Sequence, residues 1–188
     1  MGFHHVAFAT RDPEATHRFY SEVMGFELVH VNVTPTPGDH GGWSKHFFYS
    51  TGSGDDGSPD GGMIAFWDIH DTKIGDGFPV DINAMAGLPG WVNHVAYDAP
   101  TVEDLERHLR RWREHGQTVV DIDHGFCRSI YIRDPDNNMV EFCHTLRDFT
   151  PEERARAAAF VIDPSPPFDH EEAKITVHPP LTAAPTPA

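Results

Sequence analysis

Apolar and polar residues follow the same order twice along this chain. Each half opens with an alternating run typical of a half-buried strand, at residues 3–9 and 91–98, and continues with apolar residues at helical spacing. Three further strand-like runs follow each helix, at 26–33, 46–49 and 63–67, and again at 118–122, 129–133 and 139–144. The pattern predicts two modules with the order β-α-β-β-β, as expected for a duplicated unit.

The two predicted helices carry signals at both ends. Asp12 can cap the first helix, and Gly25 can end it. Thr101 begins the second helix with Asp104 three residues later, a capping-box-like pair, and Gly116 closes it. We therefore expect one helix between the first and second strands of each module.

A histidine occupies the same place in both modules. His5 begins the run His-Val-Ala-Phe and His94 the run His-Val-Ala-Tyr, while Glu141 lies between apolar neighbours in the last strand of the second module. A carboxylate that faces a core needs a cation or another partner, because burying it unpaired is costly. Two imidazoles and one carboxylate on separate strands can hold a divalent metal and leave the opposite coordination positions open. His5, His94 and Glu141 are therefore the candidate metal ligands.

The two modules predict one α+β domain over residues 1–146, with the first module at about 1–70 and the second at about 91–146. The connection at 71–90 has no clear periodicity, and long connections of this kind in compact domains are more often functional, for example as a lid.

The composition changes beyond the second module. Residues 147–188 are expected to hold a short helix over 154–160 and a Pro-rich tail without a core of its own. The final stretch, at 179–185, is expected to be disordered or strapped over the surface.

Composition narrows the classes of function. With 29 acidic against 14 basic residues the formal net charge is −15, which would repel a nucleic acid backbone. No apolar run reaches the roughly 20 residues of a membrane-spanning helix, and the first residues do not resemble a signal peptide. Cys127 and Cys143 are too few for a disulfide scaffold. We expect a protein of the cytoplasm that binds neither nucleic acid nor membrane.

Residues 3–146 resemble the vicinal oxygen chelate superfamily, which includes glyoxalases, bleomycin-resistance proteins, epimerases and extradiol dioxygenases. The resemblance rests on the paired modules and on His5, His94 and Glu141, which fall where this family has its metal ligands. It implies that the two modules form a curved mixed sheet around a metal site, followed here by the C-terminal helix and the Pro-rich tail.

Within this family the second module is most similar to extradiol dioxygenases. Their signature is a histidine, an aliphatic-Tyr pair, an acidic-Pro pair and the metal-binding Glu, and the chain has His124, Ile130-Tyr131, Asp134-Pro135 and Glu141 in that order. Asn137 stands where the family usually has Gly, but Asn tolerates the same left-handed turn. The resemblance gives His124 and Tyr131 the role of catalytic groups that hydrogen-bond substrate or metal-bound oxygen.

The last strand of the first module separates branches of the family. Glyoxalases and epimerases commonly have a fourth protein ligand there, and the simplest register places Ala65 at that point, whereas a slip of one residue would bring in Asp68 or His70. Extradiol enzymes tend to have an acid-base histidine on this strand. His46, on the neighbouring strand, is the nearest candidate for that catalytic role.

These features favour a ferrous, extradiol-type dioxygenase that acts on a catechol-like vicinal diol and dioxygen. The metals Mn, Ni, Zn and Co stay open, since imidazole and carboxylate suit several first-row ions. Two alternatives also stay open: a metal-dependent glyoxalase or epimerase-type isomerase or lyase, and a non-catalytic protein that binds an aromatic antibiotic. An exposed sheet edge leaves a homodimer open as well.

Overall fold

Every strand that the periodicity predicts is present in the computed structural model, which describes residues 3–36, 38, 41–52, 62–168 and 173–181. Its helices and two sheets make the protein an α+β fold, as expected. The chain divides into two compact units, residues 1–95 with 133–140 and residues 96–132 with 141–188. No helix in the described part of the chain is long and apolar enough to cross a membrane.

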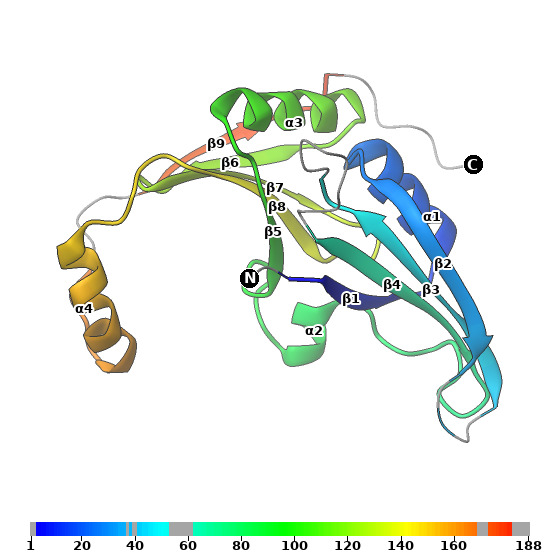
Figure 1. Cartoon of the computed structure of the whole chain (residues 1–188). Helices are drawn as coiled ribbons and strands as arrows, with labels where there is room; N and C mark the ends of the chain where they lie inside the picture. Colours follow the sequence, from blue (N-terminus) through cyan, green and yellow to red (C-terminus); the bar gives the residue numbers. More distant parts are fainter. Residues whose placement is uncertain (1–2, 37, 39–40, 53–61, 169–172, 182–188) are drawn as a thin grey trace. The chain divides into compact units, whose positions relative to one another are not determined.

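The first module builds a four-stranded sheet in the order β1-β4-β3-β2 (Figure 1). β1 runs parallel to β4, and the other neighbours are antiparallel. The strands are β1 (His5–Thr10), β2 (Glu27–Pro35), β3 (Gly42–Ser50) and β4 (Met63–Asp71).

One face of this sheet carries the core of the first unit. The helix α1 (Pro13–Arg18) begins at Asp12, whose side chain accepts the Ala15 N–H (2.9 Å), and runs on into a π-helical turn at Phe19–Val23. Tyr20 from that turn packs on Phe66 with ring centroids 4.5 Å apart. Aromatic side chains from β3 and β4 therefore anchor the helix to the sheet.

The connection between the modules contains a short helix that its weak periodicity did not predict. This helix, α2 (Ile82–Ala86), is capped by the Asp81 side chain and ends at Gly87, whose φ of 68° is left-handed. A five-residue helix spans little more than one turn, too short for an amphipathic repeat to show in the sequence.

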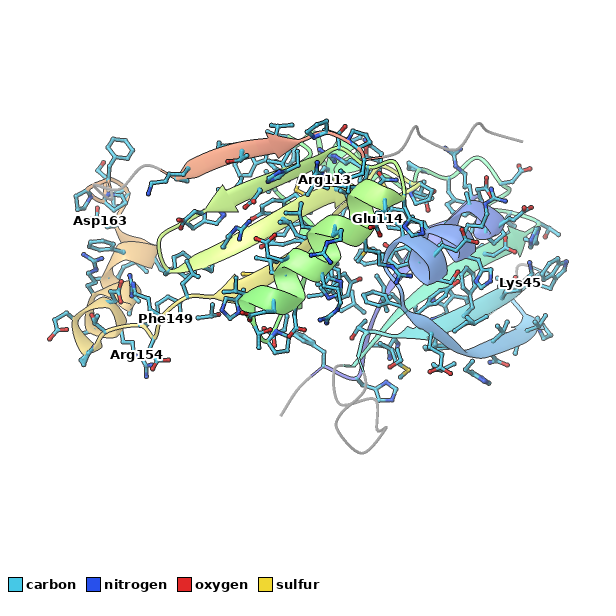
Figure 2. All side chains as sticks on the ribbon, turned by 90° about the horizontal axis from the view of Figure 1, so that it is seen from above. Lys45, Arg113, Glu114, Phe149, Arg154 and Asp163 are labelled. Atoms are coloured by element: carbon cyan, nitrogen blue, oxygen red, sulfur yellow. The ribbon has the colours of Figure 1, made fainter. Side chains whose placement is uncertain are left out.

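The second module contributes to a five-stranded sheet in the order β5-β8-β7-β6-β9 (Figure 1). Helix α3 (Val102–Glu114) lies across one face of it (Figure 2) and has the expected capping box of Thr101 and Asp104. Phe142 from β8 stacks on His108 of α3 with ring centroids 3.6 Å apart. The strands are β5 (His94–Asp98), β6 (Val119–Asp123), β7 (Cys127–Arg133), β8 (Met139–Thr145) and β9 (Lys174–His178).

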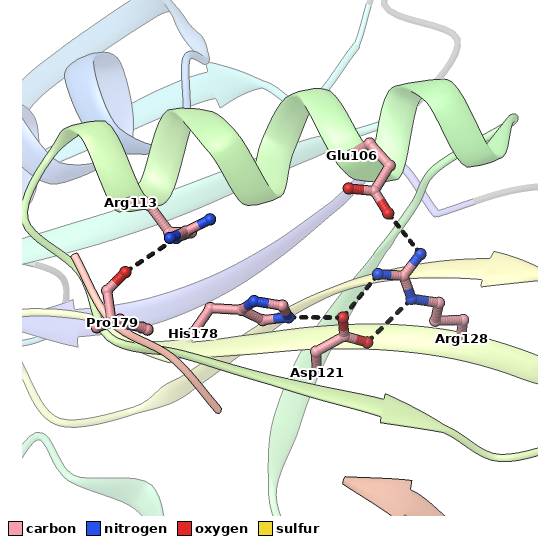
Figure 3. Close-up of polar contacts among 6 residues, drawn as sticks. All are labelled: Glu106, Arg113, Asp121, Arg128, His178 and Pro179. Carbon is pink, nitrogen blue, oxygen red and sulfur yellow. Dashed lines mark hydrogen bonds and ion pairs between the residues drawn. The ribbon is translucent and has the colours of Figure 1, made fainter. Parts of the chain in front are cut away.

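Strand β9 comes from the tail, where the sequence predicted only a short helix and a Pro-rich segment. It pairs antiparallel with β6, and the side chain of His178 contacts Asp121 Oδ2 at 3.0 Å. Asp121 also receives two hydrogen bonds from Arg128, which reaches Glu106 on α3 (Figure 3). The tail is thus tied into the second sheet through its ladder and through a charged cluster.

The tail helix is longer than expected and stands apart from this core. α4 (Pro151–Ile162) includes the predicted 154–160 but buries none of its residues. Of the final stretch at 179–185, only residues 179–181 lie within the described part. There the Arg113 side chain on α3 donates to the Pro179 carbonyl (2.9 Å), and the Arg113 carbonyl accepts the Leu181 N–H (2.9 Å).

Candidate metal and substrate site

His5 lies on the face of the first sheet opposite to α1. The register pairs His5 with Met63 on β4, so Ala65 and Trp67 follow on the same face by strand alternation. Across β3, Phe48 is paired with Ala65 and His46 with Trp67. The ring of His5 lies 5.9 Å from His46 and 5.4 Å from Phe48 between centroids, so these histidines share one aromatic-lined surface.

The alternation also places the candidates for a fourth ligand. Ala65 shares the face of His5, whereas Asp68 and His70 belong to the other face of β4. There Asp68 is nearly buried and pairs with Lys45 (2.8 Å) and His70 (3.0 Å), and His70 stacks on Trp43 at 3.9 Å. Asp68 therefore already has Lys45 and His70 as partners, on the face that His5 does not use.

His46 is held in a setting that favours its neutral form. Burial lowers the pKa of His46, and the neighbouring imidazoles of His5 and His30 lower it further. Its ring stacks on Trp67 with centroids 3.8 Å apart, and its buried Nε2 has no hydrogen-bond partner among the described residues. A neutral imidazole with a buried, unused nitrogen is able to accept a proton or a hydrogen bond.

The backbone before β5 orients His94. The Trp91 carbonyl lies 3.1 Å from His94 Nδ1, which makes Nε2 the nitrogen that would face a metal. His5 also uses Nδ1 for a hydrogen bond, with Nδ1 of His4 at 2.8 Å.

Asn83 is a positioning residue that the sequence did not reveal. Its buried side-chain amide donates to the carbonyls of Gly90 (2.9 Å) and Asn93 (2.8 Å) and accepts the Asn93 N–H (2.8 Å), so it fixes the segment that leads into His94. A lone Asn in a weakly patterned connection gives no sequence signal of this role.

Glu141 lies on the face of the second sheet that α3 does not cover. Its neighbour Phe142 packs under α3, so alternation turns Glu141 and Cys143 to the other side, where Tyr131 also lies. Glu141 is 5% exposed. Burial raises the pKa of Tyr131 to about 12, and the charge and hydrogen bonding of Glu141 act in the same direction.

His124 joins this group from the turn between β6 and β7. Its Nε2 lies 3.2 Å from the Tyr131 hydroxyl. Cys127 shares the same face. Burial raises the pKa of its thiol to about 12, and the neighbouring thiol of Cys143 raises this pKa as well. The structure thus brings together His124, Tyr131 and Glu141, three of the residues selected from the sequence.

The turn before β8 has the conformation expected for it. Asn137 has φ 65°, the left-handed region in which Asn replaces the usual Gly. Asp134 accepts the N–H groups of Asp136 (3.0 Å) and Asn138 (2.8 Å) and the Tyr20 hydroxyl (3.1 Å). Tyr20 and this turn belong to the same unit, so the Tyr20 hydroxyl anchors the turn within that unit.

The three candidate metal ligands are divided between the units. His5 and His94 belong to the first and Glu141 to the second. Within the described residues, no group of three or more His, Cys, Asp or Glu side chains has metal-binding geometry. The assignment of His5, His94 and Glu141 therefore stays a prediction.

A cavity of about 550 Å³ lies elsewhere in the first unit, and none of the selected site residues lines it.

The sequence profile and the fold together define the class of protein. The sequence profile of the glyoxalase, bleomycin resistance protein and dioxygenase superfamily matches residues 2–142, so the chain belongs to this superfamily. Two solved structures share the fold. A glyoxalase/bleomycin resistance protein/dioxygenase domain from Frankia sp. EAN1pec has a TM-score of 0.52 at 17% identity and covers 77% of this chain and 98% of its own. The fosfomycin resistance protein FosX from Listeria monocytogenes has a TM-score of 0.50 at 20% identity, with coverages of 82% and 98%.

Two curated relatives are more similar in sequence. Biphenyl-2,3-diol 1,2-dioxygenase 3 of Rhodococcus globerulus is 40% identical over 81 residues, which cover 42% of this chain and 40% of the relative. MhqE of Bacillus subtilis (strain 168), provisionally named a ring-cleaving dioxygenase, is 40% identical over 147 residues, which cover 63% and 46%. The chain therefore spans less than half the length of these relatives.

Proposed function

We propose that this protein is an extradiol-type, ring-cleaving dioxygenase that acts on a catechol-like vicinal diol with dioxygen. His5, His94 and Glu141 would hold a ferrous ion. The observation that carries the proposal is the cluster of Glu141, Tyr131 and His124 on the face of the second sheet that α3 does not cover. The names of the two sequence relatives, a diol dioxygenase and a ring-cleaving dioxygenase, support the same chemistry.

The residues present suit a divalent metal. Two imidazoles and a carboxylate are the donor set of non-haem ferrous oxygenases. The carbonyl of Trp91 at Nδ1 of His94 supplies the backbone partner that metal-bound histidines usually have. When bound, the metal would orient the diol and dioxygen beside each other and pass electron density between them.

Tyr131 and His124 would handle hydrogen bonds and protons. With a pKa of about 12, Tyr131 stays protonated at neutral pH, and its O–H, which hydrogen-bonds Glu141, would turn to an oxygen of the bound diol. His124, 3.2 Å from that hydroxyl, can orient it and exchange a proton with it. His46 offers a further neutral imidazole on the surface of His5.

Metal content tests the ligand assignment. Protein purified without oxygen and loaded with Fe(II) is expected to hold about one metal per chain, because two imidazoles and one carboxylate would form a single divalent-metal site. His94→Ala should lose stoichiometric metal, whereas His115→Ala, at the end of α3, should keep it. Full occupancy in His94→Ala would contradict the assignment.

Oxygen uptake tests the reaction. The iron-loaded protein should consume dioxygen with at least one member of a broad catechol panel and form a yellow ring-opened product. Tyr131→Phe should lower kcat about a hundredfold with a smaller change in KM, because the lost hydrogen bond acts mainly on the reaction. Tyr97→Phe is the matched control, since Tyr97 packs on Phe142 under α3. Turnover of a methylglyoxal-thiol adduct with no diol consumed would favour an isomerase instead.

A further inference from the structure

Strand β9 widens the sheet face that carries Tyr131. The ladders place Val177 of β9 opposite Val120 of β6, and Val120 opposite Tyr131 of β7. A second row joins Ile175, Ile122 and Ser129 in the same way. Since residues directly opposite each other in a sheet point to the same side, both rows lie on the face of Tyr131 and Glu141.

The alternate residues of β9 confirm this orientation. His178 contacts Asp121, which lies with Arg128 and Glu106 of α3 on the helix-covered side (Figure 3). Strand alternation therefore turns Ile175 and Val177 away from α3. The charged cluster fixes not only the position of β9 but also which of its side chains face the candidate site.

These apolar side chains are open to solvent. Ile175 is 65% exposed and Val177 59% exposed, although Ile122 and Val120 beside them are partly covered. The sheet of the first module has four strands and no counterpart of β9 among the described residues. The tail thus adds two β-branched apolar residues to a face whose other end holds the candidate catalytic groups.

The apolar residues of β6 and β9 on this face form a strip, whose length and charge limit what it can bind. Neighbouring strands are about 4.8 Å apart, so Val177 lies two strands, or roughly 10 Å, from the backbone of Tyr131. Its members Val120, Ile122, Ile175 and Val177 are all uncharged, and the acidic Glu141 lies beyond Tyr131. Such a surface suits an apolar group and offers no cation to an anionic one.

We propose that β9 is a specificity element and that Ile175 and Val177 bind an apolar substituent carried by the diol. This inference rests on the proposed dioxygenase function. A substituent of the diol is the expected occupant of the strip, because the strip begins beside the Tyr131 hydroxyl, which would contact the diol, and runs from there to the sheet edge. A preferred substrate therefore has a hydrocarbon arm on the ring, and a carboxylated arm is rejected.

Substituted catechols test the inference. Catechol, 4-methylcatechol, 4-tert-butylcatechol, 4-hexylcatechol and 3,4-dihydroxybenzoate are compared with the iron-loaded wild type and with Ile175→Thr/Val177→Thr. Threonine keeps the branched shape that suits a strand, so β9 should stay paired. The control is Thr176→Val, which makes the reverse change on the helix side of the same strand.

We expect the double variant to lower kcat/KM about tenfold for the hexyl compound, mostly through KM, and less than twofold for catechol. Thr176→Val should change neither. Equal losses for all catechols, or no loss for the hexyl compound, would overturn the role of β9. Sedimentation that shows the double variant dissociating a dimer would overturn it as well, because Ile175 and Val177 would then cover a second copy.

Anaerobic binding separates this inference from the proposed reaction. If the wild type consumes oxygen with none of the compounds, the dioxygenase proposal fails, and the role of the strip is then tested by the affinities of the metal-loaded protein for hexylcatechol and catechol. A hexyl preference that disappears in the double variant would support it. The role of the strip would be refuted if the ratio of the hexylcatechol affinity to the catechol affinity were equal in both proteins, or if neither compound bound.

Discussion

Asp134 is a residue whose charge depends on the fold. It is 7% exposed, and burial raises its pKa from an ordinary 3.8 to about 6. The two backbone N–H groups and the Tyr20 hydroxyl that it accepts favour the charged form but do not outweigh burial. The turn that positions β8 therefore contains a carboxyl group that ionises at a higher pH than an ordinary aspartate.

This raised pKa predicts a dependence of stability on pH. Since the folded pKa lies above the unfolded one, the native state binds more protons between about pH 4 and 6, and the free energy of unfolding falls as pH rises through that window. Asp134→Asn keeps the shape and removes the titration. The stability of the variant relative to wild type should therefore rise by about 1 to 3 kcal/mol from pH 4 to pH 7.

Urea unfolding of both proteins at several pH values measures this difference. Asp12→Asn, at the exposed cap of α1, is the control for a carboxyl outside the core. A constant difference between Asp134→Asn and wild type across the range would show that burial does not set the charge of Asp134.

Individual residues differ in how far the sequence could predict them. The left-handed Asn137 was predictable, because its place in the turn demands a residue that tolerates positive φ. The contact of His124 with Tyr131 fits an ordered motif. Asn83 was not predictable, since its role depends on three backbone groups up to ten residues away that only the folded connection brings together.

At the scale of elements, two helices share the same capping box in different surroundings. Thr101 accepts the Asp104 N–H (3.1 Å) at the start of α3, and Thr150 accepts the Glu153 N–H (3.2 Å) at the start of α4. Helix α3 buries Leu105, Leu109 and Trp112, but α4 buries nothing. The caps are chemically alike, and only one belongs to an element that supports a core.

Removing each cap should therefore have different consequences. Thr101→Ala is expected to lower the global free energy of unfolding by about 1 kcal/mol, because α3 unfolds together with its sheet. Thr150→Ala should leave that value unchanged and only speed amide exchange within α4, because α4 can fray alone. Urea unfolding and hydrogen exchange of the two variants measure this. Equal global losses would mean that α4 unfolds cooperatively with the core.

Most elements followed from local patterns, but the short helix α2 and the strand β9 did not. Strands β1 to β8 and helices α1 and α3 carry periodicity and caps that can be read without tertiary structure. Strand β9 also has a β-branched, alternating run, Lys-Ile-Thr-Val-His, but its Pro-rich surroundings concealed it. What makes it a strand is the open edge of β6, which no local pattern reveals.

At the scale of the whole molecule, negative charge dominates. The formal net charge of −15 is spread over 188 residues, and self-repulsion of this size destabilises a compact state. Ion pairs such as that of Arg147 with Glu153 (2.8 Å) are exposed and contribute little each.

Added salt should therefore stabilise the protein. Raising NaCl from about 10 mM to about 150 mM shortens the screening length from roughly 30 Å to about 8 Å, so the urea midpoint should rise. A parallel series with sucrose of equal osmolality separates screening from solute exclusion. A midpoint that falls with NaCl would show that attractive ion pairs outweigh the net repulsion.

The attachment of β9 also has a consequence for how the protein is made. Strand β6 is complete by Asp123, whereas its edge partner β9 begins only at Lys174. During synthesis, β6 therefore emerges with an unpaired edge, and about fifty more residues must be added before its partner exists. For that interval the growing chain offers other chains a strand edge that the completed sheet covers, so ribosomes that stall between these two strands would leave products prone to aggregate.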